Sequence, residues 1–110
     1  RLCTREEWQS SCGSRYPYRG AYKQGACRVA QADSTPVAAG SLGGCTSVWG
    51  VYDMVGNVAE WVAGGRRSGG SAATPGEEAT CDRSLPTSKS NDLLGFRCCR
   101  FPAAQKESEK

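Results

Sequence analysis

The sequence predicts a small α+β domain that is low in regular secondary structure and stabilised by disulfide bonds. Three observations support this fold class: one capped helix followed by two strand-like segments, a long turn-rich region between them, and seven cysteines spread over the whole chain. The chain has 110 residues, of which 38% are hydrophobic. A chain of this length buries a limited fraction of its surface, so disulfides are expected to supplement a modest core.

The helix is predicted over residues 4–12. Thr4 can accept a hydrogen bond from a free amide of the first turn while Glu7 reaches back to the amide of Thr4, which is the capping-box arrangement. We expect Leu2 and Trp8 to dock inward.

The rest of the chain is rich in turns. Residues 13–44 show no helical or strand periodicity, and residues 64–78 are rich in Gly, Ser and Ala. The densest apolar run contains a Gly-Asn turn, from which residues 57–62 are predicted to leave as a strand. Residues 93–101 are predicted to form a final strand, and residues 102–110 a frayed polar tail.

The composition excludes several classes of function. The net charge of +3 is too small to indicate nucleic-acid binding. Residues 66–70 (Arg-Arg-Ser-Gly-Gly) have a composition found in RNA-binding segments, but repeats and interleaved aromatic residues are missing. No segment is long enough to span a membrane as a helix. The chain contains no histidine, which excludes His-dependent catalysis and imidazole-based zinc sites.

Some residues have both a structural and a functional interpretation. Four aromatic residues either pack or line a ligand groove, and packing is preferred: Tyr16, Tyr18, Trp49 and Trp61. Cys98 and Cys99 are interpreted as two structural cysteines on opposite strand faces rather than as a redox-active pair. Zinc binding by cysteines alone is disfavoured because no C-x-x-C spacing occurs. Glu77 and Glu78 are expected to be solvated rather than catalytic.

Three segments, in this order, resemble one protein family. Residues 1–8 (RLCTREEW) are similar to "RLPTEAEWE", residues 50–61 (GVYDMVGNVAEW) to "GLYDMxGNVWEW", and residues 95–97 to "GFR". In addition, residues 68–71 (SGGS) are similar to "RGGS". These motifs are typical of the formylglycine-generating-enzyme, or sulfatase-modifying-factor, family. The resemblance covers residues 1–101 and corresponds to the C-terminal half of that family's domain. It implies a C-type-lectin-like variant of the α+β class.

The resemblance also suggests how the cysteines pair. Cys12 and Cys81 match a family disulfide, and Cys98 matches a cysteine whose family partner lies upstream of this chain, so we expect it to be unpaired or paired outside the chain. Cys27 and Cys45 have no counterpart in the family and are predicted to pair with each other. Cys3, which replaces the family's proline, is predicted to pair with Cys99.

The catalytic cysteine pair of the family has no match here. The family's enzymes oxidise a protein cysteine to formylglycine with two copper-binding cysteines, and their spacing corresponds to positions near Thr74 and Ala79. Neither side chain can replace a thiolate as a nucleophile or metal ligand. No catalytic residues and no copper are therefore expected.

A calcium site is implied by the central motif. The family's ligands correspond to the carboxylates of Asp53 and Glu60 and to the carbonyls of Gly56 and Val58, a set of oxygens suited to a hard cation. The alternative is that the two carboxylates only cap the turn. The family's other calcium site is poorly matched, because Arg28 stands at its asparagine position.

The sequence thus predicts a non-catalytic binding or structural module of an extracytoplasmic protein, whether periplasmic, secreted or at the cell surface. Its expected partner is another protein or the remainder of its own domain. Two alternatives are a copper-dependent formylglycine-generating oxidoreductase and a lectin-like recognition domain that binds through loops 13–44 and 64–80.

Overall fold

The helix α1 comprises Arg5–Cys12 and begins at the predicted capping box. The amide of Glu7 donates to Thr4 Oγ1 at 3.0 Å, and the amide of Thr4 donates to Glu7 Oε1 at 2.8 Å. Trp8 is buried on the inner face of the helix, as predicted. Leu2, in contrast, is exposed rather than docked inward. Its backbone forms an isolated antiparallel bridge with Cys98.

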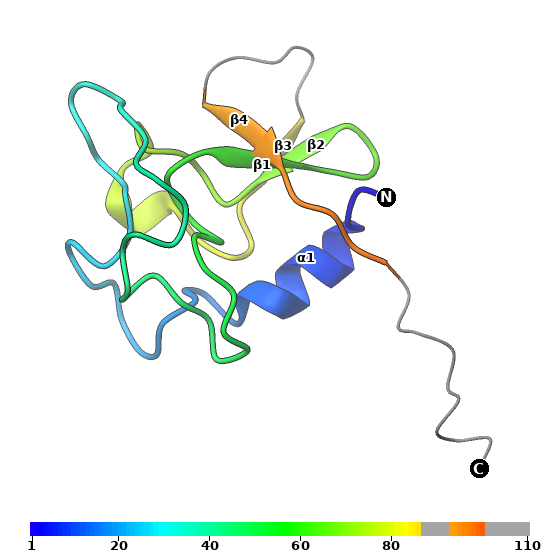
Figure 1. Cartoon of the computed structure of the whole chain (residues 1–110), viewed down its shortest axis with the longest axis horizontal. Helices are drawn as coiled ribbons and strands as arrows, with labels where there is room; N and C mark the ends of the chain where they lie inside the picture. Colours follow the sequence, from blue (N-terminus) through cyan, green and yellow to red (C-terminus); the bar gives the residue numbers. More distant parts are fainter. Residues whose placement is uncertain (87–92, 101–110) are drawn as a thin grey trace.

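The computed structural model describes residues 1–86 and 93–100, and its strands form one mixed sheet (Figure 1). The strands are β1 (Ala59–Val62), β2 (Arg66–Ser68), β3 (Ser84–Pro86) and β4 (Leu94–Phe96), in the order β3-β2-β1-β4. β1 pairs with β4 in parallel, whereas β1–β2 and β2–β3 are antiparallel. A 3-10 turn, η1 (Gly76–Glu78), lies between β2 and β3. The α+β class is therefore confirmed.

Two of these strands were not predicted from the sequence. The segment 64–78, interpreted as irregular, contains β2 and η1, and β3 follows it. Strands of three residues are too short to show an alternation of apolar and polar side chains, so their pairing is decided by neighbouring strands. The two predicted strands are shorter than expected, since β1 begins at Ala59 and β4 ends at Phe96. Phe101 and the tail at 102–110 lie outside the described residues.

The segment 13–58 contains no helix or strand, in agreement with the prediction of a loop-rich middle. It forms the irregular part of the molecule beside the helix and sheet (Figure 1). Backbone hydrogen bonds hold it to the segment before η1: Ala30 N donates to Thr74 O, and Gln31 N donates to Ala72 O, both at 2.8 Å. The loop is thus fixed by discrete tethers rather than by a strand ladder.

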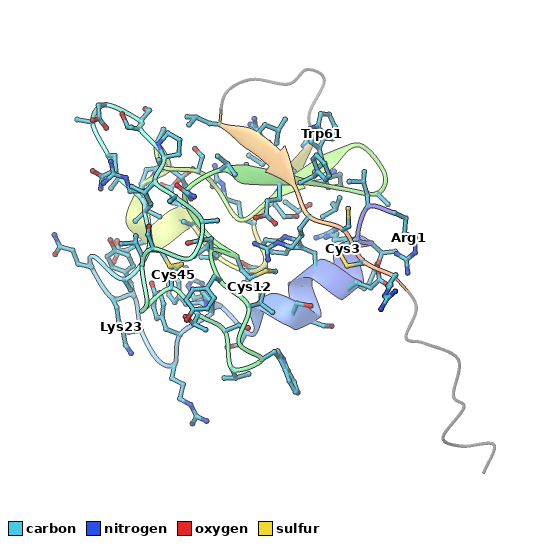
Figure 2. All side chains as sticks on the ribbon, in the orientation of Figure 1. Arg1, Cys3, Cys12, Lys23, Cys45 and Trp61 are labelled. Atoms are coloured by element: carbon cyan, nitrogen blue, oxygen red, sulfur yellow. A yellow bond between two sulfur atoms is a disulfide. The ribbon has the colours of Figure 1, made fainter. Side chains whose placement is uncertain are left out.

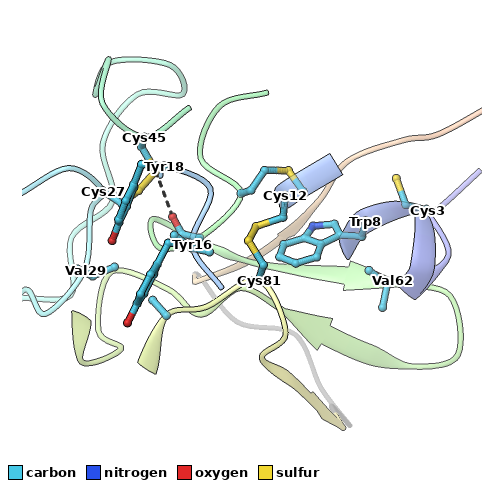
Figure 3. Packing of buried hydrophobic residues seen from close by; sticks show 13 residues of the cluster. Cys3, Trp8, Cys12, Tyr16, Tyr18, Cys27, Val29, Cys45, Val62 and Cys81 are labelled. Carbon is cyan, nitrogen blue, oxygen red and sulfur yellow. Dashed lines mark hydrogen bonds between the residues drawn. A yellow bond between two sulfur atoms is a disulfide. The ribbon is translucent and has the colours of Figure 1, made fainter. Parts of the chain in front are cut away.

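The core lies between α1 and the sheet and extends into the loops. Trp8 lies close to the Cys12–Cys81 disulfide and to Val62 (Figure 3). Tyr16 and Tyr18 are buried and stack with ring centroids 5.3 Å apart. These two tyrosines therefore pack, which was the preferred interpretation of the aromatic residues.

The cysteines form three disulfides that join distant segments. The pairs are Cys3–Cys99, Cys12–Cys81 and Cys27–Cys45, which are the pairs expected from the sequence. Cys98 carries a free, exposed thiol. The Cys3–Cys99 disulfide and the hydrogen bond from Cys99 N to Arg1 O hold the start of the chain beside the segment that leaves β4.

Candidate functional site

The central motif, residues 50–61, forms a tight turn that leads into β1. Asp53 and Asn57 have positive φ angles of 59° and 60°, a conformation that Asp and Asn tolerate better than most residues. Gly56 lies so close to a neighbouring loop that a Cβ atom would come within 2.6 Å of Arg28 O. The motif therefore requires glycine and short polar side chains at these positions for reasons of backbone geometry.

Asn57 fixes a second loop against this turn. Its Oδ1 accepts a hydrogen bond from Val37 N at 2.8 Å, and its Nδ2 donates to Val37 O at 3.0 Å. The side chain thus pairs with the backbone of Val37 as a neighbouring strand would. The asparagine of the motif is consequently a structural residue.

Asp53 is buried and only half satisfied. Its Oδ2 accepts a hydrogen bond from Gly40 N at 2.7 Å, whereas its Oδ1 is buried and has no hydrogen-bond partner among residues 1–86 and 93–100. The residue lines a cavity of about 480 Å³ whose wall includes the exposed side chains of Tyr52 and Phe96. A buried carboxylate oxygen without a donor is costly, so this atom is the part of the motif best suited to receive a cation or a hydrogen-bond donor.

Glu60 is fully engaged by the protein. Its Oε1 accepts hydrogen bonds from Trp8 Nε1 at 2.8 Å and from Arg97 Nε at 2.6 Å, and its Oε2 accepts one from Arg97 Nη2 at 2.8 Å. The same guanidinium donates to Tyr52 O at 2.9 Å. Burial by itself lowers the pKa of Arg97, but the hydrogen bonds to Glu60 and the attraction of Glu60 and Asp53 outweigh it and leave that pKa raised. The negative charge of Glu60 therefore balances the positive charge of the Arg97 guanidinium.

The four residues of the predicted calcium set differ in their fit to the ion. Asp53 has a buried carboxylate oxygen without a partner among the described residues, and Gly56 and Val58 follow it in the same segment. Glu60 does not fit, because Arg97 already neutralises its charge. Within residues 1–86 and 93–100, no group of three or more His, Cys, Asp or Glu side chains is placed to hold a metal. Glu60 is thus already engaged by Arg97 and Trp8, whereas Asp53 keeps one buried carboxylate oxygen without a partner among the described residues, and calcium binding stays a prediction.

The two positions that correspond to the catalytic cysteines lie in different surroundings. Thr74 lines a second cavity, of about 190 Å³, and its Oγ1 accepts a hydrogen bond from Ser71 N at 2.9 Å. Ala79 is buried in the core. The nearby Cys81 is bonded to Cys12, so it provides no thiol to either position.

Several large apolar side chains are exposed. Val48 and Trp49, which are 63% and 73% exposed, form the tip of a turn whose ends meet at the Thr46–Tyr52 bridge. Phe96, at the end of β4, is 65% exposed. Trp49 thus does not pack, in contrast to the preferred interpretation of the aromatic residues. Trp61 is half-buried on the sheet (Figure 2).

Sequence reasoning missed two features of these sites. Arg97 was noted only as part of the closing motif, although the buried charge of Glu60 requires a cationic partner, which is a signal that could have pointed to it. The arginines at positions 67 and 83, which line the second cavity, are far apart in the sequence and share no spacing pattern. Only the pairing of β2 with β3 brings them to one place.

Comparison with solved structures shows a similar fold. No family profile and no curated protein matches the sequence. The structure of PvdO from Pseudomonas aeruginosa is similar, with a TM-score of 0.68 and 20% sequence identity over 87% of this chain. The match covers 50% of the PvdO chain, so this chain spans about half the length of that protein. At this identity, the similarity shows the fold alone.

Proposed function

We propose that this chain is a non-catalytic, extracytoplasmic binding or structural module on a scaffold of the formylglycine-generating-enzyme type, a variant of the C-type-lectin fold. The proposal rests on the motif spacing, which puts the family's catalytic cysteine positions near Thr74 and Ala79. Neither can become a thiolate, which is the form that attacks or binds a soft metal. The motif at 50–61 contributes structural contacts instead, through Asn57 and Glu60.

The disulfides support both the absence of catalysis and the location. Six of the seven cysteines are bonded in pairs, which leaves the single exposed thiol of Cys98. Three disulfides in so small a domain indicate an extracytoplasmic environment. We propose the periplasm, the cell surface or the extracellular medium as its location. Among the described residues, no helix is long and apolar enough to cross a bilayer.

Exposed apolar side chains in the 46–52 turn and at the end of β4 are the contacts that we propose for the module. Val48, Trp49, Tyr52 and Phe96 supply the large, rigid groups that commonly anchor protein interfaces. We propose that their partner is another protein or the remainder of a longer domain, since this chain matches only half of PvdO. A lectin-like recognition domain that uses loops 13–44 and 64–80 is the second candidate, and the cavity beside Asp53 favours it.

We propose separately that calcium binds at Asp53, because Glu60 is already engaged by Arg97. The ion would be held by Asp53 Oδ1 and by the carbonyls of Gly56 and Val58, without Glu60, and would stabilise the turn. Calcium titration of the native protein should detect a weak site that Asp53→Asn removes. Glu60→Gln should leave that affinity unchanged. Equal loss in both variants would return Glu60 to the ligand set.

A thiol count on the non-reduced protein tests the main proposal. Alkylation and mass spectrometry should find Cys98 as the only modified cysteine and the three disulfides intact, and titration with Cu(I) should reveal no tight two-thiolate site. Two free thiols that include Cys81, together with tight Cu(I) binding, would instead support the copper-dependent oxidoreductase.

A further inference from the structure

The cavity at Thr74 has a composition that none of the roles above explains. It lies against the sheet and is lined by polar and apolar side chains. The polar ones are Arg67, Arg83, Ser71 and Thr74, and the apolar ones include Leu85 and Leu94. Its volume is about 190 Å³, which is room for a small group of atoms rather than for a large ligand.

Arg67 is placed by the sheet register on the outer face. Glu60, Val62 and Ser68 are buried, and Glu60 contacts Trp8 of α1, so they mark the inner face of β1 and β2. Arg67 alternates with Ser68 and stands opposite Leu85 in β3, which puts both on the other face.

The guanidinium of Arg67 has no partner in the part of the chain that the structure describes. Its neighbour Arg66, in contrast, donates to Ser84 Oγ at 2.7 Å and to Ser84 O at 2.8 Å. An arginine that is half-buried beside an apolar wall and makes no ion pair is suited to bind an oxyanion, because its donors are fixed in a plane that matches a carboxylate.

Arg83 is held only weakly. Its Nη1 lies 3.7 Å from Glu78 Oε1, and the Glu78 side chain is 63% exposed. Exposed ion pairs of this kind contribute little to stability, so Arg83 can exchange Glu78 for a ligand at small cost. Two positive charges then face the same cavity, with one weak counter-charge outside it.

The two hydroxyls can add donors to the same site. Ser71 Oγ accepts a hydrogen bond from Ala73 N at 3.3 Å, and Thr74 Oγ1 accepts one from Ser71 N. Each oxygen therefore acts as an acceptor, and neither hydroxyl hydrogen has an acceptor within residues 1–86 and 93–100. Both hydrogens are free to donate to an anion in the cavity.

We propose that this cavity binds a carboxylate carried on a short aliphatic chain, with the carboxylate between Arg67 and Arg83 and the chain against Leu85 and Leu94. The inference names a ligand class for the binding role proposed above and rests on that role. The same chemistry is offered by a free small carboxylic acid and by the C-terminal carboxylate of a peptide that ends in an aliphatic residue.

The test uses the oxidised full chain and butanoate as the probe, followed by NMR chemical-shift titration of the backbone amides. Butanoate should shift amides at 67, 71, 74 and 83 with a Kd on the order of 1 mM, because a ligand of so few atoms binds weakly. Butan-1-ol, which has the same chain length but no charge, should not shift these amides. Tighter binding of inorganic phosphate than of butanoate would contradict the aliphatic part of the proposal.

Variants decide whether the arginines are responsible. Arg67→Gln and, separately, Arg83→Gln should each weaken butanoate binding by about tenfold, while Arg5→Gln, an equal charge change on the exposed side of α1, should leave it unchanged. Equal affinity in all three variants would overturn the proposal. Two separate variants are made so that, if one of them fails to fold, the other still tests the proposal.

A final arm separates the two sources. A short peptide that ends in Ala-Val with a free C-terminal carboxylate is compared with the same peptide amidated at its C-terminus. If the peptide with the free carboxylate binds more tightly than butanoate, the site is assigned to peptide C-termini. Equal or weaker binding assigns it to free carboxylates. The thiol count described above is made on the same sample, so failure of this inference and failure of the non-catalytic role are distinguished.

Discussion

Arg97 and Glu60 form a two-point ion pair on the inner side of the sheet, with nitrogen–oxygen distances of 2.6 and 2.8 Å. Glu60 also accepts the indole hydrogen bond of Trp8. One carboxylate thus connects α1, β1 and the segment that follows β4, which are far apart in the sequence. The motif residue that suggested a metal ligand is in this protein the centre of a structural network.

Replacement of Glu60 by glutamine tests this role. The Gln side chain can still accept from Trp8, but it leaves Arg97, which is partly buried, without its ion-pair partner. We expect the free energy of unfolding to fall by about 3 kcal/mol, because removal of one partner of a buried pair is strongly destabilising. Urea denaturation at neutral pH measures this free energy of unfolding. Glu6→Gln, on the exposed face of α1, is the control, and an equal effect in both variants would refute the network.

Gly69 allows the closest backbone approach in the domain. A Cβ atom there would lie 2.3 Å from Met54 O and 3.0 Å from the Trp8 ring, and its φ is 86°. Gly20 has a similar φ of 84° with open space around it. Gly20→Ala should therefore cost about 1 kcal/mol for the backbone conformation alone, and Gly69→Ala about 3 kcal/mol because a steric clash is added. Thermal unfolding compares them, and equal costs would show that the clash relaxes.

Local signals made some of the fold predictable. The capping box at Thr4 and Glu7 involves residues three apart, so the sequence alone identifies the helix start. The turn at Gly56 and Asn57 is equally local. β2 and β3 carry no such signal, since three-residue strands are defined by their partners. The bridge between Leu2 and Cys98 joins the two ends of the chain and has no local signal either.

The site was less predictable than the fold, for a related reason. Asp53 and Glu60 look alike in the sequence, as two carboxylates seven positions apart, and the resemblance gave both the same role. The structure separates them, because Arg97 neutralises one and leaves the other with an unpaired oxygen. Of the disulfides, only Cys12–Cys81 was anticipated as a match to a family pair, and spacing alone could not fix the others, since seven cysteines permit many pairings.

The pair of Arg1 and Glu7 makes stability depend on acid pH. Two hydrogen bonds of 2.7 Å from Arg1, together with the one from Thr4 N, lower the pKa of Glu7 from 4.5 to about 2. A carboxylate with a lower pKa in the folded state stabilises the fold above its unfolded pKa, and that contribution is lost as the pH falls from about 4.5 to about 2. The difference in Tm between the wild type and Glu7→Gln should therefore shrink between pH 5 and pH 2. In an Arg1→Gln background, this pH dependence of the Tm difference should weaken. If it is unchanged there, the pH dependence belongs to other groups.

The disulfides close loops of different lengths, and the loss in free energy of unfolding on removal of each should increase with loop length. Cys27–Cys45 closes a separation of 18 residues and Cys12–Cys81 one of 69. In the chain-entropy model, the double Cys→Ser variants should lose about 3 and about 4 kcal/mol respectively. Both are made in a Cys98→Ser background to prevent exchange with the free thiol, and urea denaturation gives the free energies. The Cys12–Cys81 variant should lose more than loop closure alone predicts, since this disulfide also packs against Trp8 in the core (Figure 3). A larger loss for Cys27–Cys45 would mean that the loop at 13–58, and not the helix–sheet core, limits the stability of the domain.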